Sequence, residues 1–166
     1  MSLLEVGSDE RSASIVLNYV LVLAISTVLV TGLLVAGGTF VEDNRERVIH
    51  SELTVIGNHI AGNVEQVDRL ASASQENVGD DPDVAYINQS FQTHVTGSSY
   101  TVELVEGDPP NDEPPKVVLT ATDPTVTVEV NTTVKNNVED SFAYGGTITV
   151  YYDADEDEKV LVIANE

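Results

Sequence analysis

The spacing of apolar residues changes once within the first 81 positions, which contain no proline. From Ile15 to Phe40 no side chain is charged, so a helix here would be apolar around its whole circumference. Such a helix would be about 39 Å long, whereas the hydrocarbon core of a bilayer is about 30 Å thick. The pattern predicts a membrane-spanning helix over 13–40. The alternative, a secretory signal removed whole, normally has a shorter apolar core of about 7–15 residues.

Beyond Phe40 charged residues appear, but apolar residues still recur every three or four positions. They form one stripe, made of Ile49, Leu53, Ile56, Ile60, Val64, Val67 and Ala71. An amphipathic helix in water must bury such a stripe against another element. We therefore expect one helix from about Ser14 to Gln75, whose amphipathic continuation occupies 41–78. Gly57 and Gly62 are positions where this helix could bend, because glycine weakens a helix.

From about residue 80 the apolar period changes to two, which is typical of strands. The β-rich runs are Tyr100–Leu104, Lys116–Thr122, Val126–Val130, Gly146–Tyr152 and Lys159–Ala164, with one or two more strands between Val84 and Val95. Asp153–Glu158 is expected as a hairpin loop between the last two runs. We expect an α+β fold, in which one long N-terminal helix is packed by a small antiparallel sheet of five to seven strands, a β-rich head over 79–166.

Charge and composition exclude several functions. The chain has 28 acidic and seven basic side chains, no cysteine and a formal net charge of -21. Without cysteine there is no disulfide framework, no thiolate zinc site and no cysteine nucleophile. The excess of acid repels phosphates, so we expect no nucleic-acid partner.

The acidic excess also bears on the medium. Beyond Phe40 there are 25 acids and six bases (28 without Glu5, Asp9 and Glu10, and seven without Arg11), a net charge of -19. High salt screens such repulsion, because the Debye length is about 3 Å at 1 M. The composition therefore favours a high-salt medium, and the alternative is an acidic interaction face in an ordinary medium.

Motifs for catalysis and metal binding are incomplete. The acids of Asp153–Glu158 are spaced like the start of a calcium loop, but Glu158 and Ala164 stand where that loop needs Gly and Glu. His50 and His59 are nine residues apart, about 14 Å along a helix, and cannot share a metal within one chain. The sequence has no zinc-protease, nucleophile-elbow or phosphate-loop motif. We expect no enzyme activity, no metal site and no cofactor.

Other features leave alternatives open. Gly32 and Ala36 have the small-xxx-small spacing of a close helix–helix contact, but glycine is common in membrane helices anyway. The arginines on the two sides of the uncharged segment weakly favour a cytoplasmic C-terminus. Two possible N-glycosylation sites, at Asn88 and Asn131, favour the opposite orientation. Asn131 follows an alternating run, so we expect it at an exposed strand end.

The start of the chain carries a family resemblance. Asp9–Leu21, with Arg11, Ser12 and Ala13 directly before the uncharged helix, resembles the beginning of haloarchaeal type IV pilin-like proteins. The resemblance implies that Arg11 is the basic recognition position and that a prepilin peptidase cuts after Ser12, removing the leader 1–12 and leaving Ala13 as N-terminus. The family prefers Gly or Ala where this chain has Ser12. Leu17 stands where bacterial pilins carry Glu, so their assembly salt bridge does not transfer.

Two later segments, Val41–Arg47 and the Gly145-Gly146 strand with Tyr151–Asp153, also look like this group. The resemblance implies a structural subunit, or minor subunit, of an archaeal type IV pilus-like surface filament. Its N-terminus would be cytoplasmic and its head extracellular, and Ser14–Phe40 would carry assembly. The implied partners are the lipid bilayer, copies of itself or other pilin-like subunits, and a prepilin peptidase. The alternative is a membrane-anchored extracellular binding or adhesion module that does not polymerise.

Overall fold

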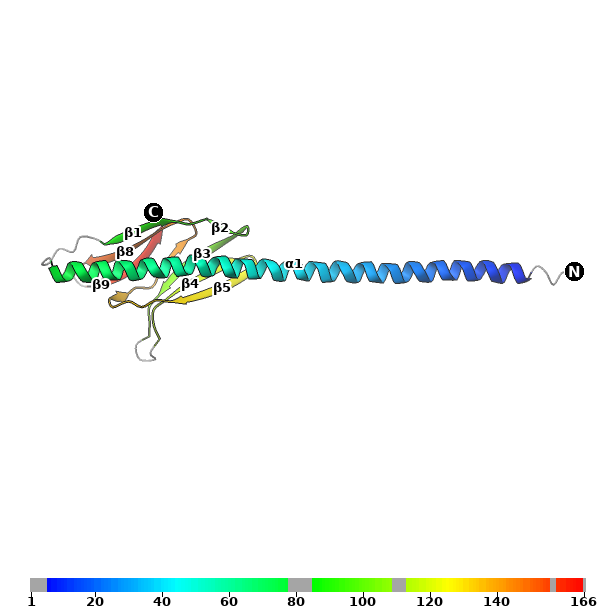
Figure 1. The fold of residues 1–166 in the computed structure, drawn as a ribbon, viewed down its shortest axis with the longest axis horizontal. Coiled ribbons are helices and arrows are strands. Elements are labelled where there is room, and N and C mark those ends of the chain that lie inside the picture. Colours follow the sequence, from blue (N-terminus) through cyan, green and yellow to red (C-terminus); the bar gives the residue numbers. More distant parts are fainter. Residues whose placement is uncertain (1–5, 78–84, 109–112, 156–157, 166) are drawn as a thin grey trace. The chain divides into compact units, whose positions relative to one another are not determined.

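The computed structural model describes residues 6–77, 85–108, 113–155 and 158–165. These ranges hold one helix and nine strands, and the expected α+β fold class is confirmed (Figure 1). Their order is α1 (Val6–Asn77), β1 (Tyr86–Ser90), β2 (His94–Val95), β3 (Ser98–Val105), β4 (Lys116–Thr122), β5 (Thr125–Asn131), β6 (Asn137–Val138), β7 (Ser141–Tyr144), β8 (Thr147–Asp155) and β9 (Glu158–Asn165).

The chain divides into two compact units, Met1–Asn44 and Arg45–Glu166, and we call the second the head unit. Helix α1 contributes to both, and its side chains are described from Ser14 to Ala73. The helix begins eight residues before the expected Ser14, at Val6. No proline interrupts this stretch, and acidic residues in the first turns of a helix are favourable.

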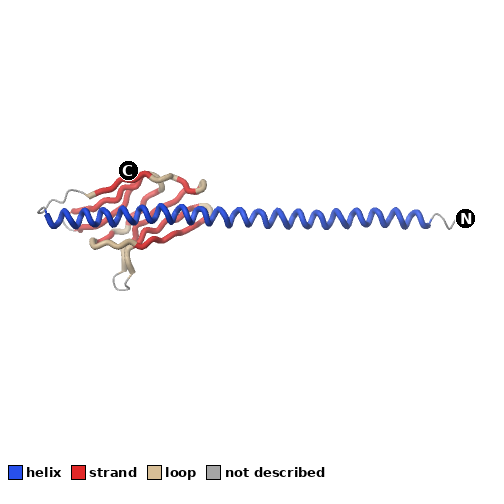
Figure 2. Tube along the Cα trace, in the orientation of Figure 1, coloured by secondary structure: helices blue, strands red, loops and turns tan. Residues whose placement is uncertain are grey.

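The strands of the head unit form two sheets, where one sheet was expected. The first has the order β1-β8-β9-β6, and the second has the order β2-β3-β4-β5 with β7 also paired to β3. Figure 2 shows the strands in red. Every pair is antiparallel except β6 with β9, which is parallel. Alternation along a strand specifies its buried face but not its neighbour, so the pattern could not separate one sheet from two.

The structure adds detail to the turns and strands expected from the sequence. The pairing of β8 with β9 continues to Asp155 and Glu158, so the strands extend into the expected loop Asp153–Glu158. The turn between β4 and β5 contains a cis peptide bond at Asp123–Pro124. The segment expected to hold one or two strands between Val84 and Val95 holds two, β1 and β2.

The core of the head unit lies between α1 and the two sheets. All seven residues of the predicted helical stripe are buried, which confirms the amphipathic pattern. They form one cluster with inward-facing residues of both sheets, which include Tyr100, Val102, Leu104, Val117, Leu119, Val128, Ile148, Val150, Tyr152, Leu161 and Ile163. Burial of apolar area at roughly 25 cal/mol per Å² is therefore what joins the helix to the strands.

Gly57, one of the two positions where the sequence allowed a bend, lies within an uninterrupted stretch of α1, as does Gly62. Its role is close packing. A Cβ atom at Gly57 would lie 2.8 Å from Leu119 Cδ1 and 2.9 Å from Val130 Cγ2. The absence of a side chain therefore lets β4 and β5 approach the helix axis closely.

A buried carboxylate fixes the segment between β5 and β6 to the helix. Asp68 is 3% exposed, and its oxygens accept the backbone N–H groups of Lys135 and Asn136 at 2.9–3.1 Å. The side-chain amide of Asn136 donates to the same carboxylate at 2.8 Å. Several donors therefore satisfy the buried carboxylate, which offsets the cost of removing it from water.

Tyr100 on β3 and Tyr152 on β8 are the two largest fully buried side chains among the described residues. Tyr100 is held by a hydrogen bond. Its hydroxyl donates a hydrogen bond to the carbonyl oxygen of Gln92 at 2.8 Å. Burial raises the pKa of Tyr100 to about 12, because the charged phenolate would lose its hydration. Gly145 passes so close that a Cβ there would lie 2.6 Å from the Tyr100 ring, so a larger residue would displace it.

Candidate membrane and assembly helix

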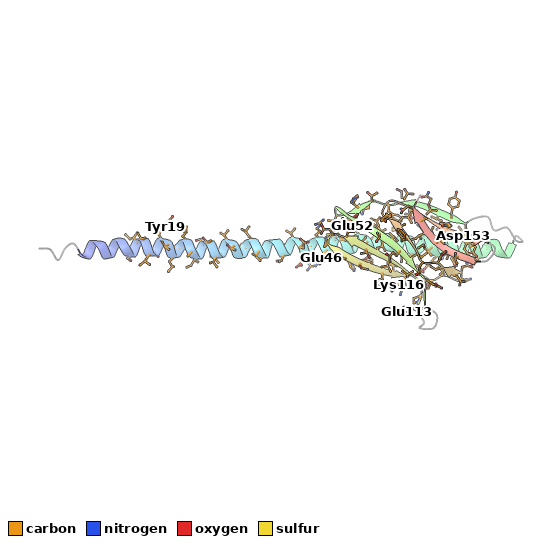
Figure 3. All side chains as sticks on the ribbon, turned by 180° about the vertical axis from the view of Figure 1, so that it is seen from behind. Tyr19, Glu46, Glu52, Glu113, Lys116 and Asp153 are labelled. Carbon is orange, nitrogen blue, oxygen red and sulfur yellow. The ribbon has the colours of Figure 1, made fainter. Side chains whose placement is uncertain are left out.

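The N-terminal half of α1 exposes a continuous apolar surface. Every side chain described from Ser14 to Asp43 is exposed. The large residues are no exception: Leu33 and Leu34 are each 73% exposed, and Figure 3 shows side chains, Tyr19 among them, standing out around the helix. Monomeric soluble proteins rarely expose contiguous apolar surface on this scale. We call residues 14–41, which contain no charged side chain, the apolar half of α1, and Ile49–Ala71 its amphipathic half.

Three threonines in the apolar half bond to carbonyl oxygens of the helix itself. The hydroxyl of Thr27 donates to the carbonyl oxygen of Leu23 at 2.8 Å, and that of Thr31 donates to Thr27 at 2.8 Å. Thr39 does the same towards Ala36 at 3.0 Å. A hydroxyl bonded in this way needs no water, so these residues are compatible with a hydrocarbon environment.

The described part of the chain holds one helix long and apolar enough to cross a membrane, and its most apolar window is not buried by the rest of the protein. A Cβ atom added at Gly32 or at Gly37 would meet no other atom within 4 Å, so the surface beside these glycines is open. Gly32 and Ala36 are four residues apart and lie on the same face of the helix. A second helix could therefore approach this face closely.

The predicted processing residues lie at the N-terminal end of α1. Arg11, Ser12 and Ala13 have helical backbones, but their side chains lie outside the described residues. The cut after Ser12 therefore stays a prediction from the sequence.

Both predicted glycosylation sites lie on the surface of the head unit. Asn131 is the last residue of β5 and is exposed, which confirms its expected place at a strand end. The hydroxyl residue of its motif, Thr133, is exposed as well. Asn88 lies within β1, where it is exposed and opposite Thr149 of β8. Both asparagines are therefore accessible to a modifying enzyme.

The few cations of the head unit include two in ion pairs. Lys116 Nζ lies 2.9 Å from Glu129 Oε2, and this hydrogen bond raises the pKa of Lys116 above its ordinary value. Arg69 lies 3.8 Å from Glu65, one helical turn away. Glu113, labelled near Lys116 in Figure 3, adds a smaller electrostatic contribution to the same shift. Because acids outnumber bases by 25 to six beyond Phe40, most carboxylates have no basic side chain to pair with, and water and dissolved salt must screen their charge.

Metal-binding geometry is absent from the described residues, where no three His, Asp or Glu side chains gather to hold an ion. His50 lines a cleft of about 410 Å³ together with Glu46 and Arg47. His59 lies at a different cleft, of about 280 Å³. The tip of the acidic hairpin, residues 156–157, lies outside the described residues.

The sequence reasoning missed one surface feature, an exposed aromatic pair on β7. The rings of Phe142 and Tyr144 are each 61% exposed, with centroids 5.7 Å apart and planes at 87°. The signal was present in the alternation Ser141–Tyr144, which places both rings on the face opposite Ala143. A four-residue run without Val or Ile is, however, a weak strand signal.

The fold and the exposed helix together define a class of protein, in which a two-sheet β head is built on the amphipathic half of a helix that is also long and apolar enough to span a membrane. The chain belongs to DUF7266, a family of unknown function, whose family model matches residues 8–164. The match covers both halves of α1 and the nine described strands, and it ends at Ala164, one residue before the end of β9. No curated protein and no solved structure matches the chain.

Proposed function

We propose that this protein is a structural subunit, major or minor, of a type IV pilus-like archaeal surface filament. The observation that carries the proposal is the contrast within α1, which is exposed and without a charged side chain over 14–41 and buried along one stripe over Ile49–Ala71. No described part of the chain buries the most apolar window of this half, so another molecule must cover it in water. Lipid would cover it before assembly, and the same segments of other subunits would cover it in a filament.

Two features support assembly over simple anchoring. The face containing Gly32 and Ala36 is open to a close helix contact, and small residues of this kind drive helix association in apolar surroundings. The resemblance of Arg11–Ala13 to a prepilin processing site is the second. In this proposal a prepilin peptidase removes 1–12, and Ala13 becomes the N-terminus of the assembling subunit.

The head would lie outside the cell, with the short N-terminal segment in the cytoplasm. The exposure of Asn88 and Asn131 is compatible with glycosylation there. A net charge of -19 beyond Phe40 suits a saline exterior and disfavours nucleic acid as a partner. The role is structural rather than catalytic.

Cysteine cross-linking tests this proposal cleanly, because the chain has no cysteine of its own. Ala36→Cys on the small-residue face should form a disulfide dimer under mild oxidation in native membranes or in sheared surface material. Leu34→Cys, on the opposite side of the helix, is the matched control and should cross-link less. Equal cross-linking of both variants, together with absence of the protein from sheared filaments, would count against assembly.

The N-terminus supplies an independent test. Intact-mass spectrometry of the protein from its native membrane should show loss of Met1–Ser12, with any glycans as added mass. A mass that retains Arg11 would exclude the proposed processing.

The second candidate function is a membrane-anchored binding module that never polymerises. The observation that favours it is the exposed pair Phe142 and Tyr144, because paired aromatic rings on a strand are more useful for recognition than for solubility. Such a protein would stay in the membrane fraction after shearing, whereas a filament subunit would be released.

A further inference from the structure

Beyond either function, the aromatic pair on β7 has the geometry of a recognition site. Phe142 and Tyr144 are arranged edge to face, so the edge of one ring meets only one face of the other. Because each side chain is 61% exposed, ring faces remain open to a ligand. An aromatic face carries the negative part of the ring quadrupole and attracts cations.

The strand that carries the rings is fixed on both sides. β7 pairs with β3 along one edge, from Thr101↔Tyr144 to Leu104↔Ser141. On its other side the Asn165 side chain holds Tyr144, accepting its N–H at 2.7 Å and donating to its carbonyl oxygen at 2.9 Å. The Ser141 hydroxyl accepts the N–H of Ile163 at 3.1 Å. A ligand would therefore meet a preformed surface, which lowers the entropy cost of binding.

Carboxylates stand beside the rings. Glu103 of β3 is exposed and lies directly opposite Phe142 in the strand register. Both residues, with Asp140, line a cleft of about 240 Å³ that has no Lys or Arg in its lining. Asp140 accepts the backbone N–H of Glu106 at 2.7 Å, which fixes the position of its carboxylate. No residue of the described ranges forms a hydrogen bond or ion pair with the Glu103 carboxylate.

Open aromatic faces next to carboxylates, on a strongly acidic protein, are complementary to an organic cation. A guanidinium group fits best, because it stacks on an aromatic face and can also make two parallel hydrogen bonds to a carboxylate. Anionic ligands would be repelled by the cleft itself. The head of a second copy would be a poor occupant of this cleft, since the chain has only seven basic side chains against 28 acidic ones.

We propose that the aromatic–acidic cleft lined by Phe142, Glu103 and Asp140, with the Tyr144 ring beside Phe142, binds an arginine side chain from a basic segment of a partner protein. The cleft lies wholly within the head unit, so the inference stands whether or not the protein forms filaments. The ring faces supply the cation–π contact, and Glu103 supplies the hydrogen-bonded counter-charge.

The test uses the full-length chain in non-ionic detergent and two fluorescent peptides. One peptide carries arginine residues between glycines and serines, and the other has the neutral isostere citrulline at the same positions. We expect the arginine peptide to bind at least tenfold more tightly by fluorescence anisotropy. Equal binding of the two peptides, or binding of neutral sugars at this cleft instead, would overturn the proposal.

Variants distinguish binding at the cleft from attraction by the overall negative charge of the head unit. Glu103→Gln and Tyr144→Leu should each weaken arginine-peptide binding by about threefold to thirtyfold, the range expected for a cation–π contact or one charged hydrogen bond. Tyr144→Phe keeps the ring, so it should keep most of the affinity and also serve as a check on folding. The matched controls are Glu46→Gln, an acid at another cleft, and Tyr86→Leu, a tyrosine 65% exposed on the other sheet.

The controls decide between specific and diffuse attraction. If Glu46→Gln or Tyr86→Leu weakened binding as much as the cleft variants, attraction by the whole acidic surface would explain the result and the proposal would fail. Raising the salt from about 0.15 M to 1 M should reduce affinity but preserve the difference between Glu103→Gln and the unmodified chain, because contact pairs are screened less than distant charges. Concentration-dependent self-association that Tyr144→Leu abolishes would show that a second copy, and not a basic partner, occupies the cleft.

Discussion

The two halves of α1 use similar residues in opposite ways. Leu29 in the apolar half is 63% exposed, whereas Leu53 in the amphipathic half is fully buried. Both belong to one uninterrupted helix, so local conformation does not explain the difference. The arrangement of the neighbouring residues does: apolar side chains all round the helix leave nothing for the chain's own strands to cover selectively, whereas a single stripe defines one face for them.

The halves also differ in how they satisfy polar groups. In the apolar half, Thr27 and Thr31 bond to carbonyls of the helix itself. In the amphipathic half, Thr54 and Asn58 do the same, but other side chains reach the strands: Asn63 donates to Gln89 of β1, and Asp68 accepts from Asn136. Because these hydroxyls are hydrogen-bonded within the helix, the apolar half needs no polar partner and can contact either lipid or other helices. Long-range hydrogen bonds tie the second half to one set of strands.

The largest expected effect comes from truncating matched leucines in the two halves. Leu53→Ala should lower the free energy of unfolding of the head unit by about 2–5 kcal/mol, because it opens a cavity in the core. Leu29→Ala should change that free energy by less than about 0.5 kcal/mol. Hydrogen exchange of head-unit peptides in detergent would measure both. A comparable loss in the two variants would mean that the apolar half contributes to the stability of the head.

Asp68 is expected to rank second. Asp68→Ala would leave the N–H groups of Lys135 and Asn136 without their acceptor, at a cost of about 3 kcal/mol. The control is Glu65→Ala on the same helix, which loses one N–H contact to Thr133 and a partly exposed ion pair with Arg69. Its cost should stay below about 1 kcal/mol. Chemical denaturation would rank the two, and equal costs would show that the buried carboxylate has no special role.

Tyr100 makes the stability of the head unit depend on alkaline pH. Its pKa rises to about 12 in the folded protein from an ordinary value of 10.0, so the folded state keeps the proton longer than the unfolded state. The stabilisation is complete below pH 10 and is lost as the pH rises towards 12. Tyr100→Phe should remove this part of the pH dependence, and the core should lose only about 1 kcal/mol with the hydrogen bond to Gln92. An unchanged slope between pH 10 and 12 in the variant would assign it to other groups.

Glycines provide the next contrast. Gly57→Ala should destabilise the head unit by about 1 kcal/mol, because overpacking against Leu119 and Val130 exceeds the gain in helix propensity. Gly62→Ala has open space around it and should stabilise the helix by about 0.5–1 kcal/mol. Gly32→Ala should leave the head unchanged. Thermal melts of the three variants would check the signs, and stabilisation by Gly57→Ala would show that the sheet can move away from the helix.

Much of this architecture could be predicted from the sequence because it depends on periodicity. The uncharged run and the stripe from Ile49 to Ala71 determine α1, and alternation identifies β3, β4, β5, β8 and β9. The division into two sheets could not be predicted, since it depends on pairings such as Tyr86 with Tyr151 that are distant in the sequence. The parallel pairing of β6 with β9 is two residues long and leaves no pattern.

The candidate sites were predictable to different degrees. The apolar surface up to Phe40 and the surface position of Asn131 followed from local pattern. In the sequence, Asp68 is one of several charged residues between the apolar positions of the helix, and only its long-range partners show why it is buried. The close packing at Gly57 could not be predicted, because Leu119 and Val130, which a Cβ there would meet, lie more than 60 residues away. The cleft beside Phe142 depends on the register that places Glu103 opposite the ring.

The smallest effect per residue is expected from salt, which should act on one region only. The net charge beyond Phe40 is -19, whereas Ile15–Phe40 has no charged side chain. At about 0.01 M salt the Debye length is roughly 30 Å, so these charges repel one another, and at 1 M it is roughly 3 Å. Protection of head-unit amides from hydrogen exchange should therefore rise with KCl, and that of the apolar half in detergent should not.

Salt also strengthens apolar burial, so a control must remove charge alone. Substitution of the exposed acids Glu113 and Glu139 provides it. Glu113→Gln with Glu139→Gln should flatten the salt dependence at its low end, whereas an unchanged curve would assign the whole effect to apolar burial.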